Sequence, residues 1–289
     1  MTRRFCLPSL VVPMLHLGEI EYANCLPIQE PFRARWGHEY RFTAGEPRAI
    51  NHLLRAGAID CAPASSIEYA RYPERYWILP GLAIGADGPA RSVVLVTPVD
   101  VARLDGREVY LTPASATSVV LLKILLEHFA GVRPRYVEGI PEDVRRPHLL
   151  IGDRAMDLVH DPPPGVEVVD LGRWWKEVTD LPMVFALWLL RRHTVAHQRQ
   201  ECARLAARLI QIRREIDDQR LAGLAADFAC PRISAERLLT YWRALSYELG
   251  DRHQAGVTRF FELAVAVGAI TQAPPLELCQ PPVGAARGA

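Results

Sequence analysis

The sequence predicts an α/β protein made of two lobes with a ligand cleft between them. Three observations support this prediction. Short apolar runs alternate with helical patterns after Met14, a second block of this kind begins at Leu104, and the chain becomes helical from Ala196 onward. Alternating strand and helix signals are typical of a sheet built from βα units. The length of 289 residues suits about two domains or one large α/β unit.

The first block consists of short strands that lead directly into helices. Its expected strands are short and apolar: Leu15–Ile20, Ile59–Ala64 and Ser92–Thr97. A helix is expected to begin at Pro47, where proline suits the first turn, and to end at Gly57. A shorter helix at Ile67–Ala70 follows the second strand, and Ser65 and Glu68 have the spacing of a capping box.

The second block repeats this arrangement and then gives way to helices. Its expected strands are Glu108–Leu111, Leu149–Ile151 and Val166–Leu171. A helix is expected at Val119–Phe129, and the aromatic segment Met183–Trp188 is expected to be a hinge region. Apolar residues at helical spacing predict three C-terminal helices, one through Leu205 and Ile216, one from Ser234 to Gly250, and one through Phe260 and Val267.

These elements divide the chain into four parts. We expect an N-terminal extension at 1–13, a discontinuous first lobe at 14–96 and 184–272, a second lobe at 97–183, and a Pro-rich disordered tail at 273–289. The chain is thus expected to cross between the lobes twice, near Ser92 and near Phe185.

The composition excludes several functional classes. With 34 basic and 33 acidic residues the formal net charge is +1, whereas a protein that grips nucleic acid needs clustered Lys and Arg in excess. The six cysteines form no Cys-x-x-Cys pair and have no histidine at metal-ligand spacing, so we expect neither a disulfide framework nor a metal site. Nucleotide-binding motifs such as the P-loop are absent from the sequence.

The N-terminus imitates a secretory signal without meeting its requirements. Arg3 and Arg4 precede the apolar run Leu7–Val12, but this run is short and is interrupted by Pro8. No later stretch reaches the roughly 18 uninterrupted apolar residues of a membrane helix. We therefore expect a cytoplasmic protein without a membrane partner.

Hydroxyl side chains gather at two predicted strand-to-helix junctions. One junction carries Ser65 and Ser66, and the other carries Ser115, Thr117 and Ser118. The N-terminal end of a helix favours a carboxylate or phosphate because its N–H groups are free and its dipole is positive there. Ordinary capping explains one serine per helix and explains the first junction at least as well. The surplus of hydroxyls at the second junction favours a ligand site.

Other candidate residues follow predicted strands. Asn24 comes directly after the first strand, where α/β folds open their ligand crevice, although an asparagine there is as often a turn residue. Ser92 begins a crossing strand without the Gly-x-Ser-x-Gly elbow of a hydrolase nucleophile. Gly152 and Asp153 follow a buried strand, where they either approach a ligand or turn the chain, and the residues alone favour a turn.

The ordered series of these motifs resembles the chorismate dehydratase family of the futalosine route to menaquinone. Six segments carry the resemblance: Gly18–Pro27, Gly57–Tyr69, Gly88–Val93, Leu111–Ser118, Ile151–Ala155 and Thr179–Trp188. Together they cover roughly Met14 to Gly268 and weaken in the C-terminal helices. The resemblance implies the two-lobed fold of type II periplasmic binding proteins. It also implies a hydro-lyase that converts chorismate to 3-enolpyruvylbenzoate without metal or organic cofactor.

The resemblance also assigns roles to the candidate residues. Asn24 and Ser92 become the expected catalytic residues. The expected substrate-binding residues are Ser65, Ser66, Ser115, Thr117, Ser118, Gly152 and Asp153. These motifs supply amides and hydroxyls but no evident basic side chain, so our hypothesis is that the substrate's own enolpyruvyl carboxylate accepts the proton. Glu19 is the rival base.

Three other functions compete with this expectation. One is a non-catalytic solute-binding or sensor protein of the same fold, and another is the sister enzyme that makes dihydroxynaphthoate, from which the segment around Asn24 separates this chain. The third, a thiamin-pyrimidine synthase of the same fold, lacks its His- and Cys-rich signature here. We expect a small dianionic substrate as the partner, and the sequence favours no particular oligomeric state.

Overall fold

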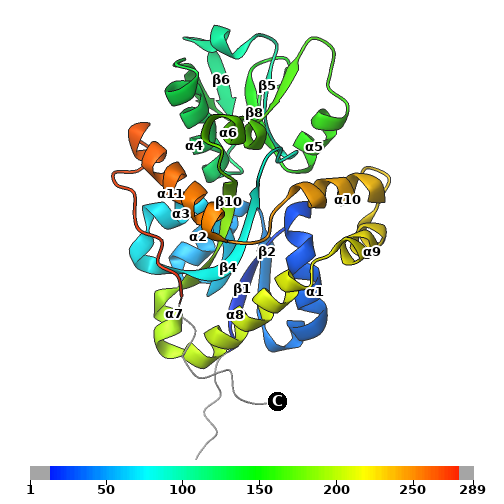
Figure 1. The fold of residues 1–289 in the computed structure, drawn as a ribbon, viewed down its shortest axis with the longest axis vertical. Helices are drawn as coiled ribbons and strands as arrows, with labels where there is room; N and C mark the ends of the chain where they lie inside the picture. Colours follow the sequence, from blue (N-terminus) through cyan, green and yellow to red (C-terminus); the bar gives the residue numbers. More distant parts are fainter. Residues whose placement is uncertain (1–13, 280–289) are drawn as a thin grey trace, which may run out of the picture.

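The chain folds into two lobes, each built on a five-stranded sheet (Figure 1). The structure is a computed structural model that describes residues 14–279. The predicted α/β fold with two lobes is confirmed. The predicted extension at 1–13 and the end of the predicted tail, 280–289, lie outside the described residues.

The sheet of the first lobe has the strand order β2-β1-β3-β10-β4. Its strands are β1 His16–Ile20, β2 Arg41–Gly45, β3 Cys61–Ser65, β4 Tyr76–Ala86 and β10 Met183–Arg191. β1 runs parallel to β2 and β3, whereas β10 is antiparallel to β3 and β4. Because β1 and β3 are parallel neighbours, the turn after Ile20 and the hydroxyl of Ser65 emerge at the same edge of the sheet.

The sheet of the second lobe has the strand order β7-β6-β8-β5-β9. Its strands are β5 Val93–Thr97, β6 Glu108–Leu111, β7 Arg135–Glu138, β8 His148–Ile151 and β9 Glu167–Asp170. β6 is parallel to β7 and β8, and β5 is antiparallel to β8 and β9. The lobe boundary predicted between residues 96 and 97 falls inside β5, so the whole of this strand belongs to the second lobe.

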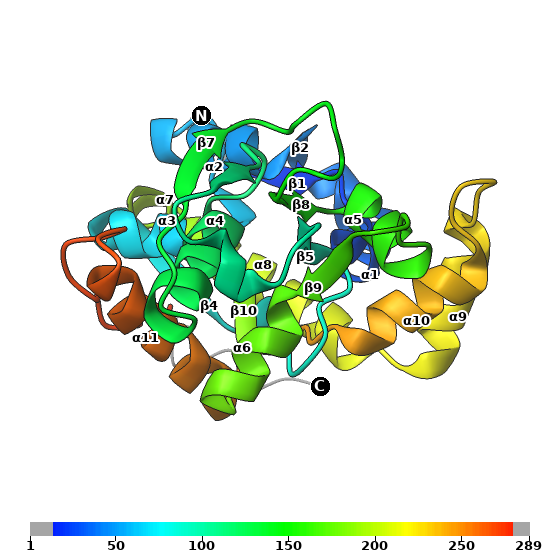
Figure 2. The same ribbon diagram turned by 90° about the horizontal axis from the view of Figure 1, so that it is seen from above.

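Helices flank both sheets, as Figures 1 and 2 show. The first lobe carries α1 Leu26–Trp36, α2 Pro47–Ala56, α3 Ser66–Arg71, α7 Arg192–His197 and α8 Arg199–Arg214. The second lobe carries α4 Ala116–Lys123, which continues as a π-helical turn at Ile124–Phe129, α5 Asp153–His160 and α6 Leu171–Thr179. The C-terminal helices are α9 Asp218–Phe228, α10 Ala235–Ala244 and α11 Asp251–Ala266. Short 3₁₀ turns lie at Ala23–Cys25, Gly37–Glu39, Pro73–Arg75 and Val101–Leu104.

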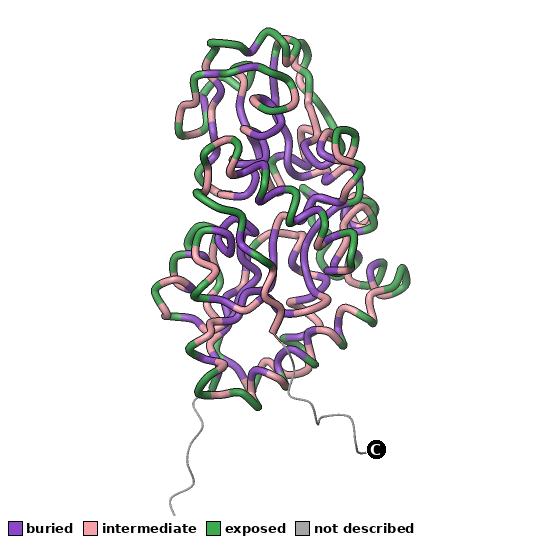
Figure 3. Tube along the Cα trace, turned by 60° about the vertical axis from the view of Figure 1, so that its left-hand side comes forward, coloured by how far each residue is buried: buried purple, intermediate pink, exposed green. Residues whose placement is uncertain are grey.

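The buried segments lie in the interior of both lobes (Figure 3). A smaller apolar cluster joins α9 and α10 to the lobes. It includes Met156 of α5 in the second lobe and, at its margin, Ala23 and Leu26 of the first lobe. The α9–α10 pair therefore packs against both lobes next to the turn that follows β1. In Figure 2 this pair lies on the opposite side of the molecule from α11.

Two short crossings join the lobes, and both are closely packed. The first crossing, residues 87–92 between β4 and β5, is tied to the second lobe by Asp170, whose carboxylate accepts hydrogen bonds from the N–H groups of Ala90 (2.9 Å) and Arg91 (2.6 Å). The second crossing, between α6 and β10, touches α11 so closely that a Cβ at Gly256 would lie 2.1 Å from the carbonyl oxygen of Pro182.

The C-terminal part differs from two predictions. The helix predicted to end at Gly250 ends at Ala244, and the extended chain after it pairs with β4, where Gly85 and Ser246 exchange two backbone hydrogen bonds (2.8 and 2.7 Å). The predicted disorder of the tail is wrong for residues 273–279, because Leu278 pairs with Ile78 of β4. Tertiary pairing with an exposed strand edge thus orders both segments.

Candidate functional site

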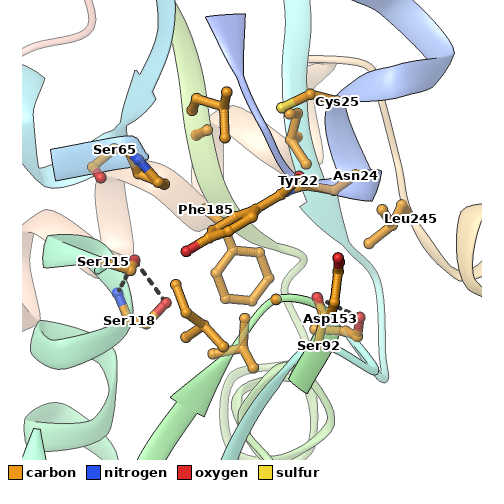
Figure 4. Close-up of a pocket in the computed structure, with 18 of the residues that line it drawn as sticks. Tyr22, Asn24, Cys25, Ser65, Ser92, Ser115, Ser118, Asp153, Phe185 and Leu245 are labelled. Carbon is orange, nitrogen blue, oxygen red and sulfur yellow. Dashed lines mark hydrogen bonds between the residues drawn. The ribbon is translucent and has the colours of Figure 1, made fainter. Parts of the chain in front are cut away.

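A cavity lies between the lobes, with about 60 Å³ of space that a water-sized molecule can reach. Seven of the nine predicted site residues line it, namely Asn24, Ser65, Ser92, Ser115, Ser118, Gly152 and Asp153. Figure 4 shows the hydroxyls of the three serines 65, 115 and 118 on one side of the Tyr22 and Phe185 rings, with Ser92 and Asp153 on the other. The cavity therefore has two polar sides and an aromatic middle.

The N-terminus of α4 supplies most of the first polar side. Ser115 is its N-cap, and its Oγ accepts a hydrogen bond from the N–H of Ser118 at 3.3 Å. The two hydroxyl oxygens are 2.9 Å apart, so they also share a hydrogen bond. Ser115 thus caps the helix, and Ser118 adds a second hydroxyl to the cavity lining.

Ser65 also lines the first polar side of the cavity. The capping box predicted for Ser65 and Glu68 is wrong. The Ser65 side chain makes no capping hydrogen bond to α3. Glu68, the expected partner, instead accepts a hydrogen bond from the hydroxyl of Tyr76 (3.1 Å) and lies 3.6 Å from the guanidinium of Arg55. The Ser65 N–H donates instead to the side-chain oxygen of Asn51 (3.2 Å), and Ser65 lines the cavity.

Asn24 lies in the 3₁₀ turn that follows β1. Its side-chain oxygen Oδ1 is buried and has no hydrogen-bond partner within the described residues. Unpaired buried polar atoms are rare and costly, so an amide left in this state is a candidate ligand contact. The indole Nε1 of Trp242 donates to the carbonyl of Ala23 at 2.7 Å and so holds the turn in place.

Ser92 ends the first crossing between the lobes. Its Oγ lies 2.8 Å from the hydroxyl oxygen of Tyr241 and 3.4 Å from the carbonyl oxygen of Ala90. Tyr241, on α10, also lines the cavity. The sequence does not mark Tyr241 as a functional residue, because it forms part of the apolar face of a helix far from Ser92 in the chain. The one feature that points to such a role is the hydroxyl of Tyr241, which lies among buried apolar residues.

Gly152 and Asp153 begin α5 on the second polar side. Gly152 has a φ of +68°, which favours glycine, and its N–H donates to the carbonyl of Ser92 at 2.9 Å. Burial raises the pKa of the Asp153 carboxyl above its ordinary value of 3.8, and the charge of Arg232, 3.3 Å away, opposes this shift. Asp153 thus puts a proton-binding group into the cavity.

Two predicted binding residues do not line the cavity. The hydroxyl of Ser66 donates to the carbonyl of Val184 at 2.7 Å, so its role is structural. The Thr117 Oγ1 accepts a hydrogen bond from the N–H of Ile67 at 3.2 Å. Because Thr117 belongs to α4 of the second lobe and Ile67 to α3 of the first, this bond joins the lobes.

Glu19 also lies outside the cavity lining. Its carboxylate forms an ion pair with the guanidinium of Arg33 on α1. Burial raises the pKa of Glu19, and the hydrogen bond from Arg33 opposes that rise. A carboxylate held by arginine away from the cavity is poorly placed to act as a base on a bound ligand.

The described residues that line the cavity include no Lys, Arg or His side chain. An anion in it would meet hydroxyls and the backbone N–H groups at the starts of α4 and α5 instead. Within residues 14–279 no group of three His, Cys, Asp or Glu side chains is arranged to hold a metal ion. In the same part of the chain, no helix has both the length and the apolar character needed to cross a membrane.

Known proteins of similar structure share this fold. A protein from Archaeoglobus fulgidus superposes with a TM-score of 0.66 at 20% identity, covering 89% of this chain and 98% of that one. The alkanesulfonate-binding protein SsuA from Xanthomonas axonopodis pv. citri, bound to MOPS, also gives a TM-score of 0.66, at 15% identity and with 92% and 96% covered. At these identities the likeness concerns the fold, which is that of periplasmic binding proteins.

Sequence relatives identify the family. Chorismate dehydratase from Thermus thermophilus is 31% identical in an alignment of 268 positions that covers 85% of this chain and 93% of that protein. The 1,4-dihydroxy-6-naphtoate synthase of the same organism is 27% identical in an alignment of 250 positions that covers 78% of this chain and 83% of that protein. A family model described as menaquinone biosynthesis matches residues 15–266. The resemblance found in the motifs is thereby confirmed, and the chain belongs to this menaquinone biosynthesis family.

Proposed function

We propose that the protein is a chorismate dehydratase, a hydro-lyase that converts chorismate to 3-enolpyruvylbenzoate for menaquinone biosynthesis. One observation carries the proposal: the cavity places hydroxyls and helix N-termini on either side of an aromatic middle, and no described residue puts a basic side chain into its lining. This lining suits a dianionic, ring-shaped molecule. The relative named chorismate dehydratase, aligned over 93% of its length, supports the same assignment.

The two carboxylates of chorismate fit the two polar sides. We assign one to the hydroxyls of Ser65, Ser115 and Ser118 at the start of α4, where the helix dipole favours an anion. We assign the other to the start of α5 beside Gly152. Asp153 would repel a carboxylate there unless it takes up a proton, and its raised pKa favours this uptake.

The elimination removes a proton from the ring carbon that bears the enolpyruvyl ether and hydroxide from the neighbouring carbon, and aromatisation drives it. We propose that the substrate's enolpyruvyl carboxylate accepts the proton. Asn24 and Ser92 would fix the reacting geometry and hydrogen-bond the departing hydroxyl. Glu19, the rival base, lies outside the cavity lining, which favours the substrate carboxylate.

Ultraviolet spectroscopy of the purified protein with chorismate tests this function. We expect the absorbance of an aromatic product to appear with many turnovers per protein molecule. Stoichiometric binding without an aromatic product would instead identify a solute-binding or sensor protein. Absence of both binding and turnover, with activity towards the substrate of the sister enzyme, would identify a dihydroxynaphthoate synthase.

The proposed reaction also implies a location. Chorismate is an internal metabolite of biosynthesis, so we propose that the protein works in the cytoplasm. Fractionation of the source cells followed by immunodetection tests this proposal. Recovery in the membrane or exported fraction would contradict it.

A further inference from the structure

Two consecutive residues of α10 contact the two segments that carry Asn24 and Ser92. The hydroxyl oxygen of Tyr241 lies 2.8 Å from Ser92 Oγ. The indole Nε1 of Trp242 donates to the carbonyl of Ala23, the residue before Asn24. Of these two hydrogen bonds, the first is buried and the second is partly buried. One turn of α10 thus contacts both segments that carry the candidate catalytic residues, although neither segment lies near α10 in the sequence.

The direction of the Tyr241–Ser92 hydrogen bond follows from the acceptors available. Tyr241 is 3% exposed, and a buried hydroxyl without an acceptor costs about 1–3 kcal/mol. Ser92 Oγ is the one acceptor that the Tyr241 hydroxyl reaches within the described residues. Tyr241 therefore donates and Ser92 accepts. The proton of Ser92 then has the carbonyl of Ala90 at 3.4 Å as its protein acceptor, which is longer than an ordinary O–H···O bond.

We propose that Tyr241 is a positioning residue for the elimination: it donates its hydrogen bond to Ser92 Oγ, so that Ser92 donates its own proton to the departing hydroxyl of the substrate. The proposal rests on the proposed function. It assigns Tyr241 no contact with the reacting atoms, because it acts through Ser92.

The chemical environment favours this role. Burial raises the pKa of Tyr241, so the phenol stays protonated and remains a donor across the working pH range. A hydroxyl that accepts one hydrogen bond becomes a better donor of another, since hydrogen bonds in a chain polarise one another. The departing hydroxyl gains negative charge only in the transition state. A donor aimed at it lowers the barrier more than it strengthens substrate binding.

The chain offers a matched control in Tyr247. Both tyrosines are buried, but the hydroxyl of Tyr247 has no hydrogen-bond partner within the described residues. Tyr241→Phe and Tyr247→Phe therefore remove the same atom from similar surroundings. We expect Tyr241→Phe to lower kcat roughly tenfold, the effect of about one hydrogen bond, with KM changed by less than about twofold. Tyr247→Phe is expected to leave both constants unchanged.

The double variant shows whether Tyr241 acts through Ser92. In a Ser92→Ala background, Tyr241→Phe is expected to reduce kcat no further. A wild-type kcat in Tyr241→Phe, or the same tenfold loss with and without Ser92, would overturn the proposal. A rise in KM equal to the loss in kcat/KM would also overturn it, because that pattern indicates a binding role.

A stability measurement separates this proposal from the proposed function. Urea unfolding of the four proteins in the Tyr241–Ser92 cycle reports the hydrogen bond without any substrate. If the unfolding free energies show coupling between Tyr241 and Ser92 but the wild type does not turn over chorismate, the proposed function fails and the hydrogen bond is still supported. Turnover without coupling in either kcat or stability would mean that the Tyr241 proposal fails alone.

Discussion

At the scale of single residues, the protonation state of Asp153 decides the charge of the cavity. Among residues 14–279 it is the one carboxylate in the lining of a cavity that we assign to a dianion. Burial raises its pKa in the folded protein above the ordinary value of 3.8. Its contribution to folding stability is therefore fully present below pH 3.8 and is lost as the pH rises through the raised value. A bound anion adds repulsion and raises the pKa further.

We predict that chorismate affinity depends on the protonation of Asp153. Affinity should fall as the pH rises through the raised pKa, because the carboxyl must then take up a proton for the dianion to bind. Asp153→Asn should abolish this fall and bind chorismate roughly tenfold more tightly at pH 8, because it removes one close like-charge pair. Isothermal titration calorimetry of both proteins from pH 4 to pH 8 measures the difference. Tighter wild-type binding at pH 8 would contradict it.

The same substitution addresses the proton acceptor. If the enolpyruvyl carboxylate of the substrate is the base, Asp153→Asn keeps a kcat within about tenfold of the wild type. If Asp153 is the base, kcat falls by at least about a hundredfold, as is common when a general base is removed. Single-turnover kinetics with saturating chorismate distinguishes the two outcomes.

Asn24→Ala is predicted to lose turnover while it keeps the fold. The amide oxygen is buried without a partner within residues 14–279, so its removal costs the folded protein little. We expect kcat to fall about a hundredfold, as for the loss of one polar group that stabilises a transition state. Circular dichroism and thermal unfolding serve as controls for the fold. Full turnover in a folded Asn24→Ala protein would remove Asn24 from the mechanism.

The sequence revealed most of these residues but not their contacts. Asn24, Ser92 and Ser115 follow predicted strands or begin predicted helices, and such positions converge at one edge in α/β folds. The capping box of Ser65 was wrong because Glu68 finds stronger partners, Tyr76 and Arg55, from outside its helix. A local motif cannot report such competition from distant residues.

At the scale of elements, α11 is wedged against the second crossing between the lobes. The Cβ of an alanine at residue 256 would lie 2.1 Å from the carbonyl oxygen of Pro182, far inside contact distance. We predict that Gly256→Ala destabilises the protein by about 3 kcal/mol, the upper range for overpacking. Urea unfolding gives the difference in free energy.

Gly223 in α9 is the matched control, since a Cβ there meets no atom within 4 Å. Gly223→Ala should stabilise the protein by about 0.5–1 kcal/mol because alanine favours the helix. Equal changes in the free energy of unfolding of Gly256→Ala and Gly223→Ala would show that the contact with Pro182 does not affect stability.

Elements with a regular pattern were predicted well, and interrupted ones were missed. The strand at Glu108–Leu111 coincides with β6, and the helix from Pro47 ends before Gly57, which adopts a φ of +82°. β4 escaped prediction because Pro80 and Gly81 interrupt its sequence. In the structure it continues through them, with shifts in the register of its pairing with β10.

At the scale of the whole molecule, Thr117 is positioned to hold the lobes together. Its Oγ1 accepts a hydrogen bond from Ile67 across the lobes without lining the cavity. We predict that the lobes close on ligand binding and that this bond stabilises the closed form. Closure would exclude water from the anion and strengthen its interactions with fixed dipoles.

Small-angle scattering should show a smaller radius of gyration with saturating chorismate. Thr117→Val should weaken binding about fivefold, the cost of roughly 1 kcal/mol for one lost hydrogen bond. Thr117→Ser, which keeps the hydroxyl, should restore affinity. An unchanged radius of gyration in the wild type would contradict closure.

The two-lobed architecture could be predicted because strand and helix signals alternate in two separate blocks. The position of the C-terminal helices could not be predicted from the sequence. Their stripes of apolar residues show that α10 is buried on one face, but not that this face carries Tyr241 to Ser92. Such contacts depend on how whole elements pack, which local periodicity does not encode.

The pairing of the C-terminal segments with β4 has a consequence for solubility. β4 is the outermost strand of its sheet, and the chain covers it twice, with Ser246 opposite Gly85 and Leu278 opposite Ile78. An uncovered outer strand presents N–H and C=O groups to which a strand of another molecule can add. The segment that contains Leu278 thus protects this strand edge from pairing with another molecule. A protein shortened before Leu276 should therefore aggregate even if its cavity stays intact.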